Sequence, residues 1–445
     1  MVRKNWIVPI VLACLAGLRQ SDGLASSFSS PENLVVMRCT AGVGAEKILL
    51  DEYDVSGSSP VLRQTIELPF AGPEATTVPG IYNHDRHVHR SSDGRFVTFT
   101  GYAKAYVEGS YDDPSVDGAS ATPRVVVIVK YDGSVDLSTR LTDACDYTAI
   151  RAAVTTDGND IWVAGDNASG ATTSGGTRFT TRGSSTTVNL SQTQTLGSPT
   201  PDNIRDLNIF AGQLYNSSGS GSSVGKAIFQ VGTGLPTFGS QMLTKLTTDG
   251  SSTVSFYFLD ADVSVSGVDT IYAASSIGAT FRKYNLVAGS WTPKGLLVMP
   301  EGEPGHVTAK LMPNGQAIVY VGHGAGIYRY ADAQPYGGSL SGDMGSVFLP
   351  VPEGYTWGGF DFAPAMACSR PPQDADDDKD VDLVDFGIFQ GCFNGPNRPA
   401  KGTSSPEEAQ RCSCMDSDSD GDVDLVDFGV FQGCFNGPNR SPKCG

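Results

Sequence analysis

Aspartates recur at a regular spacing in two stretches near the carboxyl terminus. In each stretch they stand at places one, three, five, seven, nine and twelve of a twelve-residue segment. Calcium takes about six to eight hard oxygen ligands, and a loop of this length supplies them from those places, with a backbone carbonyl at place seven. The candidate calcium ligands are Asp374, Asp376, Asp378, Asp380, Asp382 and Asp385 in the first copy and Asp416, Asp418, Asp420, Asp422, Asp424 and Asp427 in the second.

The two segments differ at place six, where such a loop turns sharply and favours glycine. The second copy has Gly421, whereas Lys379 in the first copy must hold a left-handed backbone at a cost of roughly 1 kcal/mol. We therefore predict that the first loop binds Ca²⁺ several-fold more weakly. Carboxylates this close together repel one another without a cation, so the module should fold only with calcium. The alternative is a solvated acidic tail.

The acidic segment is duplicated. Residues 380–398 recur as residues 422–440, and one position in nineteen differs. After each loop, two phenylalanines stand three residues apart, which predicts the apolar face of a short helix. These aromatic residues are Phe386 and Phe389 in the first copy and Phe428 and Phe431 in the second.

Twin calcium loops, each followed by one helix, resemble a dockerin domain over about residues 374–440. The resemblance implies a small α-helical module that attaches an exported protein to a cohesin-like partner. The chain departs from the family at loop places ten and eleven, where Leu383-Val384 and Leu425-Val426 replace the usual Ser or Thr. A self-contained cell-surface or intramolecular module is the alternative to a cohesin-binding one.

Three of the five histidines lie within six residues, at His84, His87 and His89. On a strand, His87 and His89 would share one face, so a metal site is geometrically possible. The alternative is a polar stretch between strands. His306 and His323 are isolated and are expected to be structural or exposed.

No phosphate-binding loop or zinc-protease motif occurs in the sequence. Paired carboxylates could support glycoside chemistry, but each pair sits among turn residues, where a turn role is commoner. The pairs are Asp112 with Asp113, Asp157 with Asp160, and Asp260 with Asp262. The catalytic residues, if any, stay unassigned.

Short β-branched runs bounded by turn residues predict an all-β domain over residues 31–367. Such runs are 125–129, 161–164 and 317–321. Turn phrases with an Asp-Gly or similar core recur about every 50–60 residues, which favours a β-propeller. At about 48 residues per blade we predict seven blades, with six or eight as alternatives, and a pair of β-sandwiches as the other fold.

This domain also resembles a group of exported propeller-like proteins of unassigned chemistry. The phrases that carry the resemblance are residues 90–96, 208–215 and the closing 359–364. Pro371-Pro372 marks a linker, which we place at residues 368–373, before the acidic module at 374–445.

The first 25 residues resemble an export signal, with basic Arg3 and Lys4 before a short apolar run. An extracellular or cell-surface location follows, with lipid attachment at Cys14 as an alternative. Eight cysteines follow Cys14, and six of them lie after residue 360, so we expect disulfides in the tail without being able to pair them. A net charge of −17 argues against nucleic acid or anionic membranes as partners, and no later segment is apolar enough to span a membrane.

These observations predict a secreted, non-catalytic binding or scaffold propeller that attaches to partners through its calcium module. The alternative is a carbohydrate-active hydrolase or lyase that binds polysaccharide at the propeller. A propeller with metal-dependent activity is the third possibility.

Overall fold

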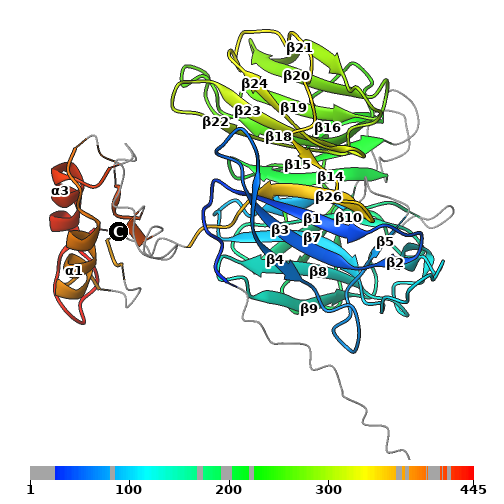
Figure 1. The fold of residues 1–445 in the computed structure, drawn as a ribbon, viewed down its shortest axis with the longest axis horizontal. Helices are drawn as coiled ribbons and strands as arrows, with labels where there is room; N and C mark the ends of the chain where they lie inside the picture. Colours follow the sequence, from blue (N-terminus) through cyan, green and yellow to red (C-terminus); the bar gives the residue numbers. More distant parts are fainter. Residues whose placement is uncertain are drawn as a thin grey trace, which may run out of the picture.

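The computed structural model describes residues 26–80, 86–167, 174–191, 203–219, 225–366, 373–375, 380–396, 398, 411–412, 414–417 and 422–444. Six four-stranded antiparallel sheets form the larger domain of the chain (Figure 1). The innermost strands contact one another in a closed ring, β26–β6–β10–β14–β18–β22 and back to β26. The domain is therefore a six-bladed β-propeller with a central channel.

From the innermost strand outward, blade 1 consists of β26 (Tyr355–Phe362), β1 (Leu34–Thr40), β3 (Ile48–Asp54) and β4 (Val61–Glu67). Blade 2 consists of β6 (Val88–Arg90), β7 (Phe96–Tyr102), β8 (Arg124–Lys130) and β9 (Val135–Leu141). Blade 3 consists of β10 (Ile150–Thr155), β11 (Asp160–Gly165), β12 (Gly176–Thr181) and β13 (Val188–Asn189).

Blade 4 consists of β14 (Ile204–Phe210), β15 (Gln213–Gly219), β16 (Lys226–Val231) and β17 (Leu243–Lys245). Blade 5 consists of β18 (Thr253–Leu259), β19 (Thr270–Ser275), β20 (Thr280–Val287) and β21 (Ser290–Val298). Blade 6 consists of β22 (His306–Leu311), β23 (Ala317–His323), β24 (Gly326–Asp332) and β25 (Leu349–Pro350). A small sheet pairs β2 (Ala45–Glu46) with β5 (Val78–Pro79), and η2 (Pro114–Val116) is a 3₁₀ turn.

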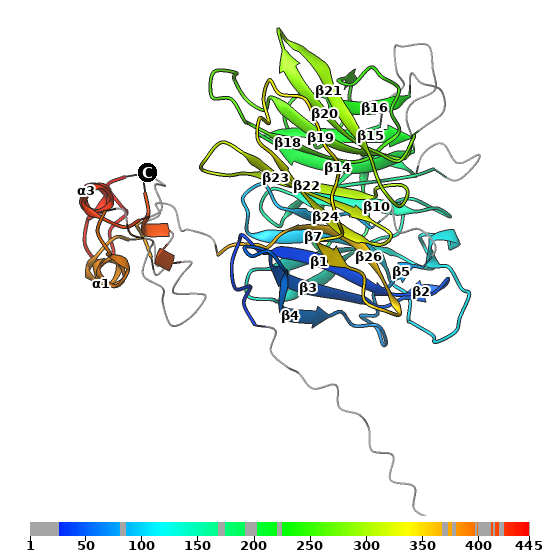
Figure 2. The same cartoon turned by 45° about the horizontal axis from the view of Figure 1, so that its top comes forward.

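The last strand of the propeller closes the ring. β26 pairs with β1 in the first blade, with Leu34 opposite Phe362 and Thr40 opposite Tyr355. Figure 2 shows these two strands, from opposite ends of the domain sequence, side by side. Because an exposed strand edge is a liability, this closure pairs the inner edge of β1 and completes the first blade.

The β-branched runs form strands because each blade is covered on both faces by its neighbours. In β8, six of seven residues are buried, and valines of alternate faces enter two different cores. The predicted runs 125–129, 161–164 and 317–321 lie within β8, β11 and β23. The all-β propeller class is thereby confirmed, with helices confined to the tail.

The recurring turn phrase connects the innermost strand of a blade to its second strand. Gly94, Gly158, Gly212 and Gly315 hold this turn in blades 2, 3, 4 and 6, all with φ between 71° and 81°. The blade number is six, not the favoured seven. From Gly94 to Gly315 the phrase recurs about every 55 residues, so a period near 48 was too short for these blades.

The tail contains two described helices, α1 (Leu383–Cys392) and α3 (Leu425–Cys434), which lie apart from the sheets in Figure 1. The two predicted helices are confirmed, and Phe389 and Phe431 are buried together with their ring centroids 5.3 Å apart, so the two copies share one core. Disulfides join Cys392 to Cys412 and Cys434 to Cys444. These two pairs confirm the expectation of oxidised tail cysteines.

Residues 1–25, most of the proposed linker, and the contrasting Lys379 and Gly421 lie outside the described residues. Among the residues that are described, no helix combines the length and apolar character needed to cross a membrane.

Candidate functional site: a buried histidine–aspartate cluster in the channel

The channel is lined by the inner edges of six strands, whose backbone N–H groups lack a neighbouring strand on that side. Polar side chains accept from several of them. Asp206 of β14 accepts from the backbone N–H of Leu207 at 2.8 Å and of Phe256, in the next blade, at 3.2 Å. Because buried backbone donors must be paired, part of the channel's polarity is structural.

Asp361 of β26 joins three blades in the same way. Its carboxylate accepts from the Arg90 N–H at 2.8 Å and from the Thr308 hydroxyl at 2.7 Å, which belong to blades 2 and 6. This carboxylate is 3% exposed, and the bonds named here account for its structural role.

Asp206 has two further neighbours that are not needed to join the blades. His89 of β6 and His87, just before that strand, approach it across the channel. The His89 Nε2 atom lies 2.8 Å and the His87 Nδ1 atom 3.6 Å from Asp206 Oδ1. All three residues are buried, with exposed fractions of 5% for His89, 1% for His87 and 0% for Asp206.

Two further residues extend the cluster. His306, at the start of β22, places its Nδ1 atom 3.2 Å from Nδ1 of His87. On the other side, the Asn208 amide Nδ2 lies 3.1 Å from His89 Nδ1, while Asn208 Oδ1 accepts from the Ile209 N–H at 2.8 Å. The amide therefore donates to His89 Nδ1, which leaves the ring proton on Nε2, facing Asp206.

The charges of the cluster favour an ionised Asp206. Burial opposes ionisation, but His87, His89 and the backbone donor together lower the pKa of Asp206 to about 2. Burial likewise opposes a charged His89, yet the carboxylate of Asp206 raises the pKa of His89 overall. A permanent negative charge thus lies between two imidazoles inside the channel.

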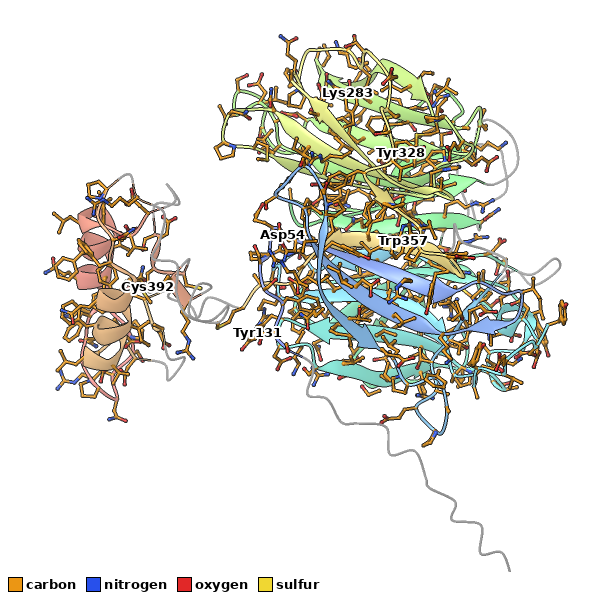
Figure 3. The ribbon with its side chains drawn as sticks, in the orientation of Figure 1. Asp54, Tyr131, Lys283, Tyr328, Trp357 and Cys392 are labelled. Carbon is orange, nitrogen blue, oxygen red and sulfur yellow. A yellow bond between two sulfur atoms is a disulfide. The ribbon has the colours of Figure 1, made fainter. Side chains whose placement is uncertain are left out.

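A cavity of about 390 Å³ opens where the innermost strands end, and Asn208 contributes to its lining. Arg90, Tyr257 and Asp361 line it too, together with turn residues of blades 2 and 4. Burial raises the pKa of Tyr257, so its hydroxyl keeps its proton. A second, much smaller space of about 10 Å³ is lined by His306, His323 and Trp357, of which Figure 3 labels Trp357. It has room for about one water molecule.

Of the predicted histidine group, His87 and His89 meet in the channel, whereas His84 lies outside the described residues. His306, expected to be isolated, contacts His87. Asp206 and Asn208 were missed, because nothing near them in sequence marks them. Their spacing of two residues on one strand, which puts both side chains on one face, was the only available signal.

The scattered carboxylate pairs serve turns and surface ion pairs. Asp157 accepts from the Asn159 N–H at 2.8 Å, Asp262 accepts from the Ser264 N–H at 2.9 Å, and Asp112 pairs with Lys104. Asp113 accepts from the Ser115 N–H at the start of η2. They lie in turns and at the surface, so they offer no glycosidase pair.

In the tail, the later candidate calcium ligands of each loop lie together. Asp380, Asp382 and Asp385 form one group and Asp422, Asp424 and Asp427 the other. Asp385 and Asp427 each accept from two backbone N–H groups of their own loops. Asp374 and Asp416 are also described, whereas Asp376, Asp378, Asp418 and Asp420 are not.

No protein-family model matches the chain, and no curated protein does. Similar solved structures include a Bacteroides uniformis protein described as a candidate 6-phosphogluconolactonase, with 13% identity and a TM-score of 0.40 over 70% of this chain and 81% of that one. A periplasmic gluconolactonase of Pseudomonas aeruginosa matches with 12% identity and a TM-score of 0.40 over 74% of this chain and 99% of that one.

These neighbours contradict the prediction of a non-catalytic scaffold propeller, with a polysaccharide-degrading enzyme as its alternative. They carry the names of enzymes that act on small lactones, not of scaffolds or polysaccharide-degrading enzymes. At such low identity the names describe those proteins only. What bears on this chain is its own channel, where a buried cluster lies next to a polar cavity.

Proposed function

We propose that the propeller is a hydrolase for small polar molecules that bind in the cavity of about 390 Å³. The observation that carries the proposal is the position of Asn208, which lines this cavity and donates to His89 of the buried cluster. Ligand pockets in proteins commonly measure about 300–1,000 Å³, so the cavity suits a molecule of sugar size.

The cavity offers donors for an oxygen that becomes negative during hydrolysis. Tyr257, whose hydroxyl keeps its proton, and Arg90 both line it. Donors fixed in a site of this kind stabilise the oxyanion formed when water adds to a carbonyl. The His–Asp cluster beneath is the group best suited, among the described residues, to activate that water.

Lactones are the first substrates to test, because the similar structures include proteins with that activity in their names. Purified protein should open a five- or six-membered sugar lactone faster than the spontaneous rate, as followed by acid release. Tyr257→Phe should lower the rate by about 100-fold, and Asp206→Asn should abolish it. Asp262→Asn, in an exposed turn, is the matched control. A folded protein without activity on any lactone or ester would contradict the proposal.

We also propose that the tail binds calcium. The support is the grouping of three carboxylates in each copy, at the spacing that an oxygen-liganded loop requires. A cohesin-like partner and an extracellular location stay predictions.

A further inference from the structure

We propose that His87, His89 and Asp206 bind one divalent transition metal ion of the zinc type inside the channel. The proposal deepens the hydrolase proposal, since such an ion would activate the attacking water. Metal binding itself does not depend on that activity and can be tested without a substrate.

The spacing of the three side chains fits one ion. One ligand atom of each residue lies within 4.8 Å of the other two. Around a tetrahedral ion with bonds of about 2.0–2.2 Å, neighbouring ligand atoms lie roughly 3.3–3.5 Å apart. The measured separations from Asp206 Oδ1, 2.8 Å to His89 Nε2 and 3.6 Å to His87 Nδ1, lie on either side of that value.

The donor set selects the class of metal. Two imidazoles and one carboxylate suit zinc and its first-row neighbours, whereas calcium and magnesium take oxygen ligands. The channel site is therefore chemically distinct from the acidic loops of the tail. Three protein ligands also leave a position for water, as catalytic zinc sites do.

Binding requires His89 to change its tautomer. In the hydrogen-bonded arrangement, His89 carries its proton on Nε2 and accepts from Asn208 at Nδ1. A metal at Nε2 needs the other tautomer, so the ring proton moves from Nε2 to Nδ1 by exchange with solvent, without net release, and the proton at Nδ1 must meet an acceptor. A half-turn of the Asn208 amide would supply its oxygen as that acceptor, in place of the bond that this oxygen accepts from the Ile209 N–H. Asn208 is thus a positioning residue between the cavity and the metal.

The test uses the full chain in millimolar calcium, which occupies the acidic loops, and adds Zn²⁺ or Co²⁺ as the probe. We expect one zinc per chain by elemental analysis, and visible absorption of Co²⁺ typical of a four- or five-coordinate site. His89→Gln and Asp206→Asn should each weaken zinc binding at least about 100-fold. His323→Gln, a histidine outside the cluster, should bind zinc normally.

Asn208→Asp and Asn208→Leu separate metal binding from folding. An aspartate at this position only accepts hydrogen bonds, so it should favour the metal-binding tautomer of His89 and raise the affinity for zinc. A leucine, which can neither donate nor accept, should lower that affinity. Stoichiometric zinc that survives in both His89→Gln and Asp206→Asn, or no zinc binding by the folded wild-type chain at about 10 µM, would overturn the proposal. A chain that binds zinc here but opens no lactone would leave this inference standing and contradict only the hydrolase proposal.

Discussion

Charged side chains buried between blades depend on partners of opposite charge. Lys283 of β20 is fully buried, and its Nζ donates to Asp332 Oδ2 at 2.6 Å and to the Gln334 carbonyl at 2.7 Å. The Tyr272 hydroxyl donates to the same carboxylate oxygen at 2.7 Å. Burial lowers the pKa of Lys283, and the bond to Asp332 opposes that change. Such a pair roughly offsets its own desolvation, but each partner needs the other.

Lys283→Met should therefore destabilise the propeller by about 3–5 kcal/mol, because it leaves the Asp332 charge buried without its cation. The double variant Lys283→Met with Asp332→Asn should lose clearly less free energy of unfolding, since the amide oxygen of the new asparagine still accepts from Tyr272. Urea unfolding followed by tryptophan fluorescence measures both. Losses that simply add would show that the two charges are not coupled.

The turn between the first two strands of a blade is the repeated element of the propeller, but its surroundings differ from blade to blade. Gly158 and Gly212 both have a positive φ, of 81° and 71°. A Cβ atom at Gly158 would lie 2.7 Å from the ring of Phe96 in the preceding blade, whereas one at Gly212 would meet nothing within 4 Å. A substitution would strain the backbone at both glycines, but it would clash with a neighbouring side chain only at Gly158.

Gly212→Ala should lower the free energy of unfolding by about 1–2 kcal/mol, because alanine is strained in the left-handed region. Gly158→Ala should cost about 1–3 kcal/mol more, because it also crowds the packing of blade 3 against blade 2. The midpoint of urea unfolding compares the two variants directly. Equal losses would mean that Phe96 moves aside without cost.

At the scale of the whole molecule, the chain combines a closed propeller with a small helical module whose core is built from the duplicated phenylalanines. The propeller is sealed through hydrogen bonds between β26 and β1 and through a core between every pair of blades. The module relies on two described disulfides and on loops crowded with carboxylates. The two parts should therefore respond differently to calcium.

Removing calcium with EGTA should unfold the helical module and leave the propeller folded, because the loop carboxylates repel one another without a cation. Three of the four tryptophans, Trp162, Trp291 and Trp357, lie in the propeller and none lies in the helical module, so tryptophan fluorescence reports on the propeller. Helical circular dichroism and proteolysis after residue 373 report on the module. If millimolar calcium changes neither signal while the disulfides are intact, the calcium proposal fails.

Features that depend on neighbouring residues could be predicted from the amino-acid sequence alone. Strands such as 125–129 and turns such as that of Gly158 could be predicted because β-branched runs and positive-φ glycines act locally. The candidate calcium ligands could be named because each loop lies within twelve consecutive residues.

The blade number and the channel cluster depend on contacts between distant parts of the chain, so they became known from the three-dimensional fold. Six blades result from how much chain each blade uses and from the pairing of β26 with β1, which joins residues more than 300 positions apart. Asp206 reaches His89 across 117 residues because both lie on innermost strands of one closed ring. A contact made by ring closure leaves no local trace, since neither residue needs the other to form its own strand.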